Sequence, residues 1–173
     1  SGNDAAFAIA ETYAQKDGDY KIFVEEMNKY AKRHNLTNTI FGDPAGLDDE
    51  VGRSTAYELA QIARLVLADD YLSSIVATPH ITISSIDGQL THVLKNTNRL
   101  IQSDTAYYWP SSLGIKTGFT LAAGHSLVSA MKFKNRILIG VVMNTTESTN
   151  TASAQEMYKL FSWANSNLSV KAY

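Results

Sequence analysis

The sequence predicts an α+β protein in which helices come first, a hairpin and an antiparallel sheet follow, and one helix closes the chain. Three observations predict this order. Apolar residues recur at helical spacing in several stretches before Pro79, they alternate with polar residues after it, and helical spacing returns at residues 152–165. Helices and strands that are segregated along a chain are typical of the α+β class.

The first two helices are expected at residues 3–15 and 19–34. The first is rich in alanine, which has the highest helix propensity, and carries Asp4 in its first turn, where a negative charge favours the helix dipole. The second ends at the asparagine-rich stretch NLTN, and its apolar positions have helical spacing: Ile22, Phe23, Met27, Tyr30 and Ala31.

A loop and a third helix follow. The stretch FGDPAGLDDEVGR is dense in glycine, proline and aspartate and is expected to be a loop. Thr55 and Glu58 have the spacing of a capping box and are expected to begin the third helix. One face of that helix is apolar: Leu59, Ile62, Ala63, Val66 and Leu67.

Strands dominate after Pro79. Asp87-Gly88 stands between HITISSI and QLTHVLK and indicates a hairpin. Three later strands are expected in SLGIKTGF, HSLVSAMKF and RILIGVVMN, and Lys134-Asn135 forms a tight turn that makes the last two adjacent and antiparallel. A helix at residues 152–165 closes the chain. No repeat or low-complexity linker interrupts the sequence, so residues 1–173 are expected to form a single domain.

Composition excludes several classes of protein. The chain has 45% hydrophobic and 18% charged residues and a net charge of -2, with no basic stripe, so a nucleic-acid partner is not expected. Its longest apolar run, residues 137–143, is far shorter than the ~20 residues that span a bilayer. It has no cysteine, and its four histidines lack metal-ligand spacing. No metal and no cofactor is expected.

The tripeptide Lys116-Thr117-Gly118 is the first candidate for a site. It lies inside an expected strand, where a glycine commonly marks the close approach of a ligand or another backbone. A lysine, a hydroxyl and a glycine in a row on a strand indicate a surface along which a substrate lies. Taken alone, the tripeptide is weak evidence, and an ordinary exposed strand is the favoured interpretation.

The tripeptide is part of a wider resemblance to a known family, which extends over several other segments of the sequence. GIKTGFTLAAGHSLVSA and SGNDAAFAIAE resemble the serine D-alanyl-D-alanine carboxypeptidases, the low-molecular-mass penicillin-binding proteins. These enzymes share the motifs S-x-x-K, S-x-N and K-T-G with class A β-lactamases. Ser1-Gly2-Asn3 and Lys116-Thr117-Gly118 match the last two, in the family's order. The resemblance continues through FVEEMNKYAKRHNLTNTIFGDPAGLDD, STAYELAQIARLVL and NTNRLI, and so covers most of the chain.

Two positions depart from the family pattern. Asp43-Pro44-Ala45-Gly46 stands where the family often has Asn-Pro-His-Gly, and Arg53 stands where a histidine commonly precedes Ser-Thr-Ala. Neither position is catalytic in the family, so these differences concern the subgroup and not the chemistry.

The resemblance implies three catalytic residues. Ser1 would contact the base lysine of S-x-x-K and help to pass a proton to the leaving D-alanine. Asn3 would hold the backbone amide of the substrate, since its side chain both donates and accepts. Lys116 would place a positive charge beside Ser1 and near the developing anion.

The resemblance also implies a substrate-binding set. Thr117 would offer its hydroxyl to the terminal carboxylate of the peptide, and Gly118 would allow the substrate to approach. The backbone N–H of Phe119 would be one donor of the oxyanion hole. Arg99 is a candidate second anchor for the carboxylate, because a guanidinium fork suits planar anions.

The nucleophile motif is the main departure. The one S-x-x-K match that merits testing is Ser129-Ala130-Met131-Lys132, within an expected strand. Residues i and i+3 share a face on a helix, but they point to opposite sides of a strand, so this match is not expected to be the nucleophile. The resemblance therefore implies the later part of a β-lactamase/penicillin-binding-protein-like domain, without its upstream strands and nucleophile helix. The 173 residues are expected to be inactive alone.

The resemblance implies partners and a location as well. The partners would be a peptidoglycan stem peptide ending in D-Ala-D-Ala, β-lactams as covalent inhibitors, and the upstream S-x-x-K segment of the same protein. The location would be extracytoplasmic, at the cell envelope. Two alternatives stay open. A β-lactamase would need a deacylating glutamate, and no E-x-x-L-N pattern occurs; a non-catalytic module that binds peptidoglycan or a protein partner would need no nucleophile.

Overall fold

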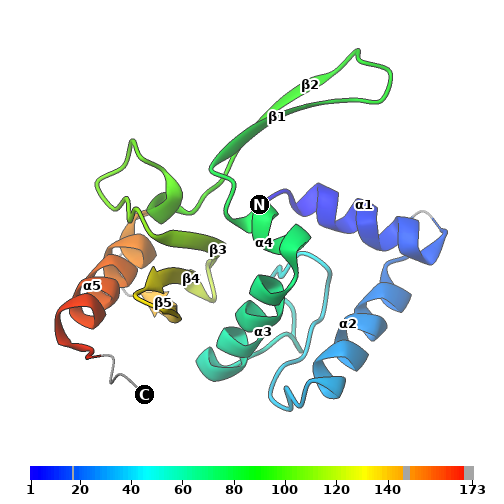
Figure 1. Ribbon diagram of the computed structural model, residues 1–173. Coiled ribbons are helices and arrows are strands. Elements are labelled where there is room, and N and C mark those ends of the chain that lie inside the picture. Colours follow the sequence, from blue (N-terminus) through cyan, green and yellow to red (C-terminus); the bar gives the residue numbers. More distant parts are fainter. Residues whose placement is uncertain (17, 146–148, 170–173) are drawn as a thin grey trace. The chain divides into compact units, whose positions relative to one another are not determined.

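The computed structural model describes residues 1–16, 18–145 and 149–169 (Figure 1). The chain forms two compact units, Ser1–Leu59 and Ala60–Tyr173. Helices precede an antiparallel sheet, so the predicted α+β class is confirmed. In the described part of the chain, no helix is both long enough and apolar enough to cross a membrane.

The first unit begins with the two predicted helices, α1 (Asn3–Ala14) and α2 (Lys21–Arg33). Their packing is aromatic: the rings of Phe7 and Tyr20 meet edge to face with centroids 5.1 Å apart, and those of Tyr13 and Phe23 do so at 5.6 Å. Edge-to-face pairs place the positive ring edge on the negative ring face and add to the burial of apolar area.

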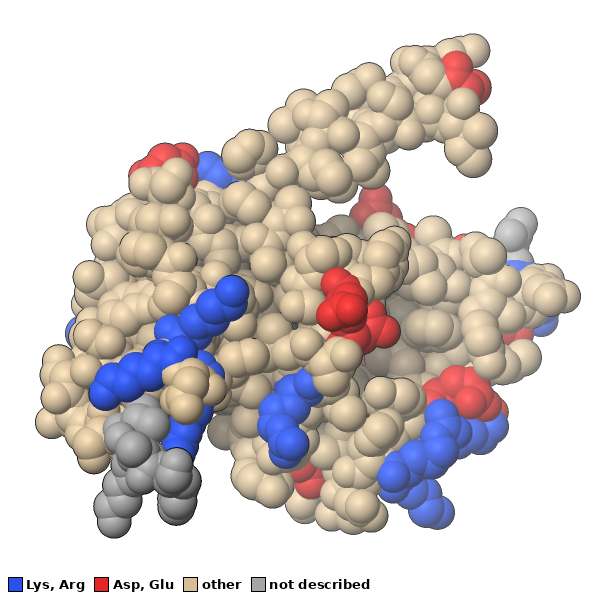
Figure 2. All heavy atoms as spheres, in the orientation of Figure 1, with Lys and Arg blue, Asp and Glu red and all other residues tan. Residues whose placement is uncertain are grey.

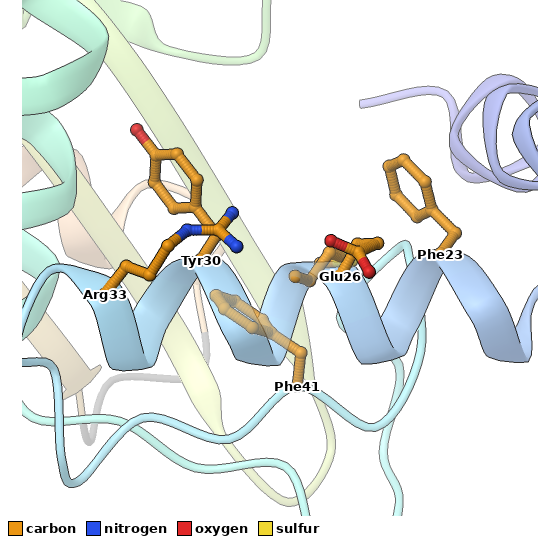
Figure 3. A pocket seen from close by; sticks show the side chains of 6 residues that line it. Phe23, Glu26, Tyr30, Arg33 and Phe41 are labelled. Carbon is orange, nitrogen blue, oxygen red and sulfur yellow. The ribbon is translucent and has the colours of Figure 1, made fainter.

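Helix α2 also lines a shallow hollow of about 300 Å³ (Figure 3). The rings of Phe23 and Tyr30 project from the helix beside Phe41 of the following loop, and the guanidinium of Arg33 lies 5.9 Å from the centre of the Tyr30 ring. The side chain of Asn28 holds that loop, because it donates to the carbonyl of Phe41 (2.8 Å) and accepts from its N–H (2.9 Å).

Helix α3 (Ala56–Ala68) begins where the capping box was predicted, but only half of the box forms. The hydroxyl of Thr55 accepts from the N–H of Glu58 (3.2 Å) as expected. The Glu58 carboxylate does not return the bond to Thr55. It accepts from the N–H (3.0 and 3.1 Å) and side-chain amide (2.9 Å) of Asn38 and from the hydroxyl of Thr39 (2.5 Å). The prediction of a reciprocal box is therefore wrong in its second half, because a loop with several donors competes for the carboxylate.

The second unit contains the last part of α3, a short helix and a hairpin. Helix α4 (Asp70–Val76) was not predicted; the Asp69 side chain caps it by accepting from the N–H of Leu72 (2.9 Å).

Strands β1 (His80–Ser84) and β2 (Thr91–Lys95) form the predicted hairpin. Ser85 and Leu90 close its loop with a backbone bond of 2.9 Å. All residues of both strands are exposed. Figure 2 shows acidic atoms near the tip of the hairpin, and Lys95 carries a positive charge at the end of β2.

The predicted sheet follows as β3 (Ser112–Thr120), β4 (Gly124–Phe133) and β5 (Arg136–Thr145), antiparallel in the order β3-β4-β5. The tight turn at Lys134-Asn135 joins β4 to β5, as predicted. Lys134 has a φ of 54°, in the left-handed region that such turns require. Helix α5 (Ala152–Asn167) ends two residues beyond its predicted end.

Each face of this sheet carries its own core. Leu127, Met131 and Phe133 alternate along β4 and pack with residues of α5, which include Met157 and Phe161. The intervening Ala130 packs on the other face with Ile115 and with Ala63 of α3. The second unit therefore has three layers, with α5 and the end of α3 on opposite faces of the sheet (Figure 1).

A β-bulge interrupts β3 just before its lysine. Ser112 pairs with Met131 and Ile115 with Ser129, so β3 holds one more residue than β4 between these pairs. Gly114 has a φ of 87° and Ile115 a φ of 139°, which is rare for a β-branched residue. The hydroxyl of the fully buried Ser129 donates to the Gly114 carbonyl at 2.8 Å. Burial of Ile115 and this bond hold the unusual backbone in place.

Replacing Gly114 tests how strictly the bulge is required. Gly114→Ala is expected to destabilise the protein by more than about 1 kcal/mol, because alanine disfavours a positive φ. In addition, its Cβ would collide with the backbone carbonyl of Val76. Urea denaturation measures the change. Gly118→Ala is the matched control, since its Cβ would meet only the Ser126 side chain at 4.0 Å, and a change within about 0.5 kcal/mol is expected. Equal stability of the two variants would contradict a rigid bulge.

Glu58 is expected to make the first unit sensitive to acid. Burial raises the pKa of Glu58, but hydrogen bonds from Thr39 and Asn38 outweigh it, and the net pKa lies below its ordinary value. A lowered pKa means that the contribution to stability is present above the unfolded-state pKa and is lost as pH falls through the folded-state pKa. Glu58→Gln should therefore speed amide exchange of Asn38 at neutral pH, and the difference from the native protein should vanish in acid. Glu156→Gln, at an exposed pair with Lys159, is the control and should leave the exchange of the Asn38 amide unchanged at neutral pH and in acid. A difference between Glu58→Gln and the native protein that did not vary with pH would disprove the linkage.

Candidate functional site

Ser1-Gly2-Asn3 stands at the beginning of the first unit. Gly2 is the N-cap of α1, and its carbonyl accepts from the N–H of Ala6 (3.2 Å). Ser1, Gly2 and Asn3 are all exposed, and Asn3 lies in the first turn of the helix. The helix therefore begins between the serine and the asparagine, with Ser1 before its cap and Asn3 in its first turn.

Lys116, Thr117, Gly118 and Phe119 all lie in β3 in the second unit. Lys116 pairs with Val128 and Gly118 with Ser126, so the lysine and the glycine share one face of the sheet. That these residues meet Ser1 and Asn3 in one groove stays a prediction, because the two tripeptides belong to different units.

Lys116 has an unusual electrostatic environment. The residue as a whole is exposed, yet burial around its ammonium group lowers the pKa. The ammonium donates to the backbone carbonyl of Thr117 at 2.5 Å. A cation that has lost part of its water is a strong partner for an anion that arrives beside it.

Thr117 has a partner that sequence reasoning missed. Its hydroxyl lies 2.5 Å from the hydroxyl of Thr97, which belongs to the segment between β2 and the 3₁₀ turn η1 (Arg99–Ile101). Thr97 is exposed, whereas Thr117 is half-buried. The signal in the sequence was the segment NTNRLI itself, in which only Arg99 was singled out.

Gly118 and Phe119 lie in an open part of the strand. A Cβ at Gly118 would have no neighbour closer than 4.0 Å, so packing within this chain does not require glycine there. The Phe119 side chain is 57% exposed and stacks on His125 with ring centroids 4.2 Å apart. In the described part of the chain β3 is an edge strand, and every second N–H of an edge strand points away from the sheet. An oxyanion-hole donor at Phe119 would need its N–H to be one of those that point away.

Arg99 makes a different contact from the one expected. Its guanidinium donates to the side-chain oxygen of Asn150 at 3.3 Å, near the start of α5. Among its described hydrogen bonds none reaches Thr117. Its role as an anchor for a carboxylate stays a prediction, and the guanidinium has other N–H donors besides the one bonded to Asn150.

The S-x-x-K match at Ser129 lies on β4, as predicted. Ser129 is fully buried and bonded to Gly114, whereas Lys132 is exposed. The serine and the lysine therefore do not form a nucleophile and base pair.

Comparisons with known proteins agree with one another. A sequence profile of the family described as D-alanyl-D-alanine carboxypeptidase matches residues 1–147. The chain is similar to D-alanyl-D-alanine carboxypeptidase DacF of Bacillus subtilis (strain 168), with 35% identity over 146 residues. It is similar to the crystal structure of D-alanyl-D-alanine carboxypeptidase from Mycobacterium tuberculosis H37Rv, with a TM-score of 0.79 and 28% identity. The cefotaxime-bound form of penicillin-binding protein D2 from Listeria monocytogenes gives a TM-score of 0.73 and 25% identity.

These matches cover nearly all of this chain but only part of each relative. The Bacillus match covers 84% of this chain and 35% of that protein. The Mycobacterium and Listeria matches cover 99% and 92% of this chain and 63% and 60% of those chains. The chain thus spans about a third of the curated relative and less than two thirds of each solved structure. The expected penicillin-binding-protein-like fold is confirmed.

The environment of Lys116 predicts an early titration. Because its pKa is lowered, the Lys116 ammonium should lose its proton at a lower pH than the ordinary value of about 10.4. NMR of protein with ¹³C-labelled lysine ε-carbons measures this, and Lys116→Arg identifies the signal by removing it. A titration at or above the ordinary value would contradict the desolvated environment.

Proposed function

Because the chain belongs to the D-alanyl-D-alanine carboxypeptidase family, we propose that it is the later part of the catalytic domain of a serine D-Ala-D-Ala carboxypeptidase. The whole enzyme would remove the terminal D-alanine from peptidoglycan stem peptides. The observation that carries the proposal is the open surface over residues 116–119 of the edge strand β3, where a lysine, a hydroxyl and a glycine without packing constraint adjoin an extended backbone. An extended peptide fits along such an edge. In this proposal both units belong to one domain.

The nucleophile would come from an S-x-x-K segment upstream of these residues. Its serine oxygen attacks the carbonyl carbon of the penultimate D-alanine while its lysine takes the hydroxyl proton. The C–N bond to the terminal D-alanine then breaks, and the amine leaves with a proton. Water hydrolyses the resulting ester and returns the serine. The absence of a usable S-x-x-K among the 173 residues supports this assignment, since Ser129 is buried in a strand.

Ser1 and Asn3 would form one wall of the groove. The Ser1 hydroxyl both accepts and donates, so it can relay a proton from the base lysine to the leaving amine. The Asn3 amide would bond the substrate backbone. Their exposure and their positions on either side of the N-cap Gly2 support these roles.

Residues of β3 would form the other wall. The Lys116 ammonium would stabilise negative charge on the substrate, and the Thr117 hydroxyl would donate to its terminal carboxylate. The Phe119 N–H would bond the oxygen that becomes negative in the transition state; one such donor is typically worth about 10²–10³ in rate. Arg99 is kept as a second anchor for the carboxylate.

Two further proposals follow from the same reaction. β-Lactams would acylate the upstream serine of the complete protein, as expected if the site accepts them in place of the D-Ala-D-Ala unit; the Listeria relative was solved in a cefotaxime-bound form. The protein would act outside the cytoplasmic membrane, where peptidoglycan lies.

Comparison of two protein forms tests the proposal. The full-length protein encoded by the gene is expected to release D-alanine from a peptide ending in D-Ala-D-Ala and to gain the mass of penicillin on one serine. The 173-residue chain is expected to do neither, because loss of a serine nucleophile costs on the order of 10⁶ in kcat. Chromatography of released D-alanine and intact-mass spectrometry are the measurements.

Lys116→Ala in the full-length protein provides the control for the site. It should lower D-alanine release strongly, whereas Lys134→Ala, at the exposed turn between β4 and β5, should not. A penicillin adduct on the 173-residue chain would contradict the missing nucleophile. A full-length protein that hydrolyses penicillin faster than the peptide would indicate a β-lactamase, and one with no reaction at all would indicate a binding module.

A further inference from the structure

We propose that Thr97 is a positioning residue of the carboxylate subsite: its hydroxyl orients the hydroxyl of Thr117, so that Thr117 donates its proton to the terminal carboxylate of the substrate. The inference rests on the proposed function and deepens it. It assigns the selectivity for a free carboxylate to a pair of hydroxyls from two separate segments rather than to Thr117 alone.

The first support is the contact itself. The two hydroxyl oxygens lie 2.5 Å apart, within the range of a short O–H···O hydrogen bond. Thr97 precedes η1 and Thr117 lies in the middle of β3, twenty residues further along the chain. Both side chains are β-branched, so each has few rotamers and holds its hydroxyl in a defined direction.

The backbone around Thr97 is fixed by its two neighbours. The Asn96 side chain accepts from the N–H of Asn98 (2.9 Å) and donates to the carbonyl of Thr78 (3.2 Å). The Asn98 side chain accepts from the N–H of Leu100 (3.0 Å) and is fully buried. The side chains of both asparagines bond the backbone of this segment, whereas Thr97, which lies between them, is exposed.

The same buried network reaches β3. The Asn98 amide donates to the Ser129 hydroxyl (3.5 Å), which in turn donates to the carbonyl of Gly114 (2.8 Å) in the bulge before Lys116. The segment that carries Thr97 and the strand that carries Thr117 are therefore tied together below the surface. The hydroxyls of Thr97 and Thr117 therefore come from two backbone segments that are each held by hydrogen bonds.

The direction of the proton between the two hydroxyls follows from their chemistry. A threonine hydroxyl has one proton to donate and two lone pairs that accept. If Thr117 donated to Thr97, it would present only lone pairs to a carboxylate, which also carries lone pairs. If Thr97 donates to Thr117, the Thr117 proton is free for the carboxylate, and the accepted bond makes Thr117 a stronger donor.

The charge beside this pair selects that direction when a substrate binds. The Lys116 ammonium lies against the backbone carbonyl of Thr117 (2.5 Å), so the subsite that we propose combines the cation of the preceding residue with two linked hydroxyls. An anion held there turns the Thr117 proton toward itself, and Thr97 supplies the bond that the Thr117 oxygen would otherwise lack.

The test compares two peptides in the full-length protein: one ends in D-Ala-D-Ala, and the other ends in D-Ala-D-alaninamide, which has no terminal charge. The ratio of their kcat/KM values measures selectivity for the carboxylate. Thr97→Val is expected to lower this ratio about three- to tenfold, the range of one neutral hydrogen bond. Thr97→Ser keeps the hydroxyl and should restore the ratio to within about twofold. Thr82→Val, on the exposed hairpin strand β1, is the matched control and should leave both values unchanged.

A second set of variants tests whether Thr97 acts through Thr117. Thr117→Val should lower the ratio at least as much as Thr97→Val, and the double variant should be no worse than Thr117→Val alone, because both changes break one unit. An unchanged ratio in Thr97→Val, an equal loss on both peptides, or additive losses would each overturn the inference while leaving the proposed function intact. A native full-length protein that releases no D-alanine would overturn the proposed function and this inference with it.

Discussion

The hydrogen bond from the buried hydroxyl of Ser129 to the carbonyl of Gly114 fixes the place where β3 gains its extra residue, and the arrangement of Lys116–Phe119 depends on that place. Loss of the bulge would shift the pairing of β3 by one residue and turn every later side chain of the strand to the opposite face. Ser129 is fully buried, so its hydroxyl must be bonded within the protein; a buried polar group without a partner costs about 1–3 kcal/mol. This bond, together with the burial of Ile115, holds the bulge that precedes Lys116.

Local patterns were sufficient to predict most of the elements. Periodicity and turn chemistry, which involve neighbouring residues only, predicted α1 and α2 to within two residues at each end, the three strands of the sheet and the turn at Lys134-Asn135. Helix α4 was missed because seven residues are too few to establish a helical period. The second half of the capping box failed because the partners of Glu58 lie some twenty residues before it, and no local pattern records a competition between distant donors.

The candidate site shows the same division between local and distant information. A motif located Lys116 and Thr117, since a short string of residue types is local. In NTNRLI the charged residue was favoured over the neutral one, because a guanidinium suits a carboxylate better than a hydroxyl does. In the structure the Arg99 guanidinium donates to Asn150, and the Thr97 hydroxyl lies against the hydroxyl of Thr117. The tight turn η1 begins at Arg99, so the two side chains leave the backbone in different directions.

The proposed reaction removes a single terminal residue and therefore requires recognition of the end of a chain, which differs from the interior of a peptide by a free carboxylate. The desolvated ammonium of Lys116 is suited to this task, because its protonated form lacks part of the water that would stabilise it. An anion bound beside it replaces that water and raises the pKa of Lys116 again. By reciprocity, a protonated Lys116 binds the anion more tightly than a neutral one by the same factor. A peptide that continued past this point would bring no charge, would leave the ammonium poorly solvated, and would leave the Thr117 proton without its strongest acceptor. Selectivity for the chain end then follows from the cost of the empty site as much as from the contacts of the filled one.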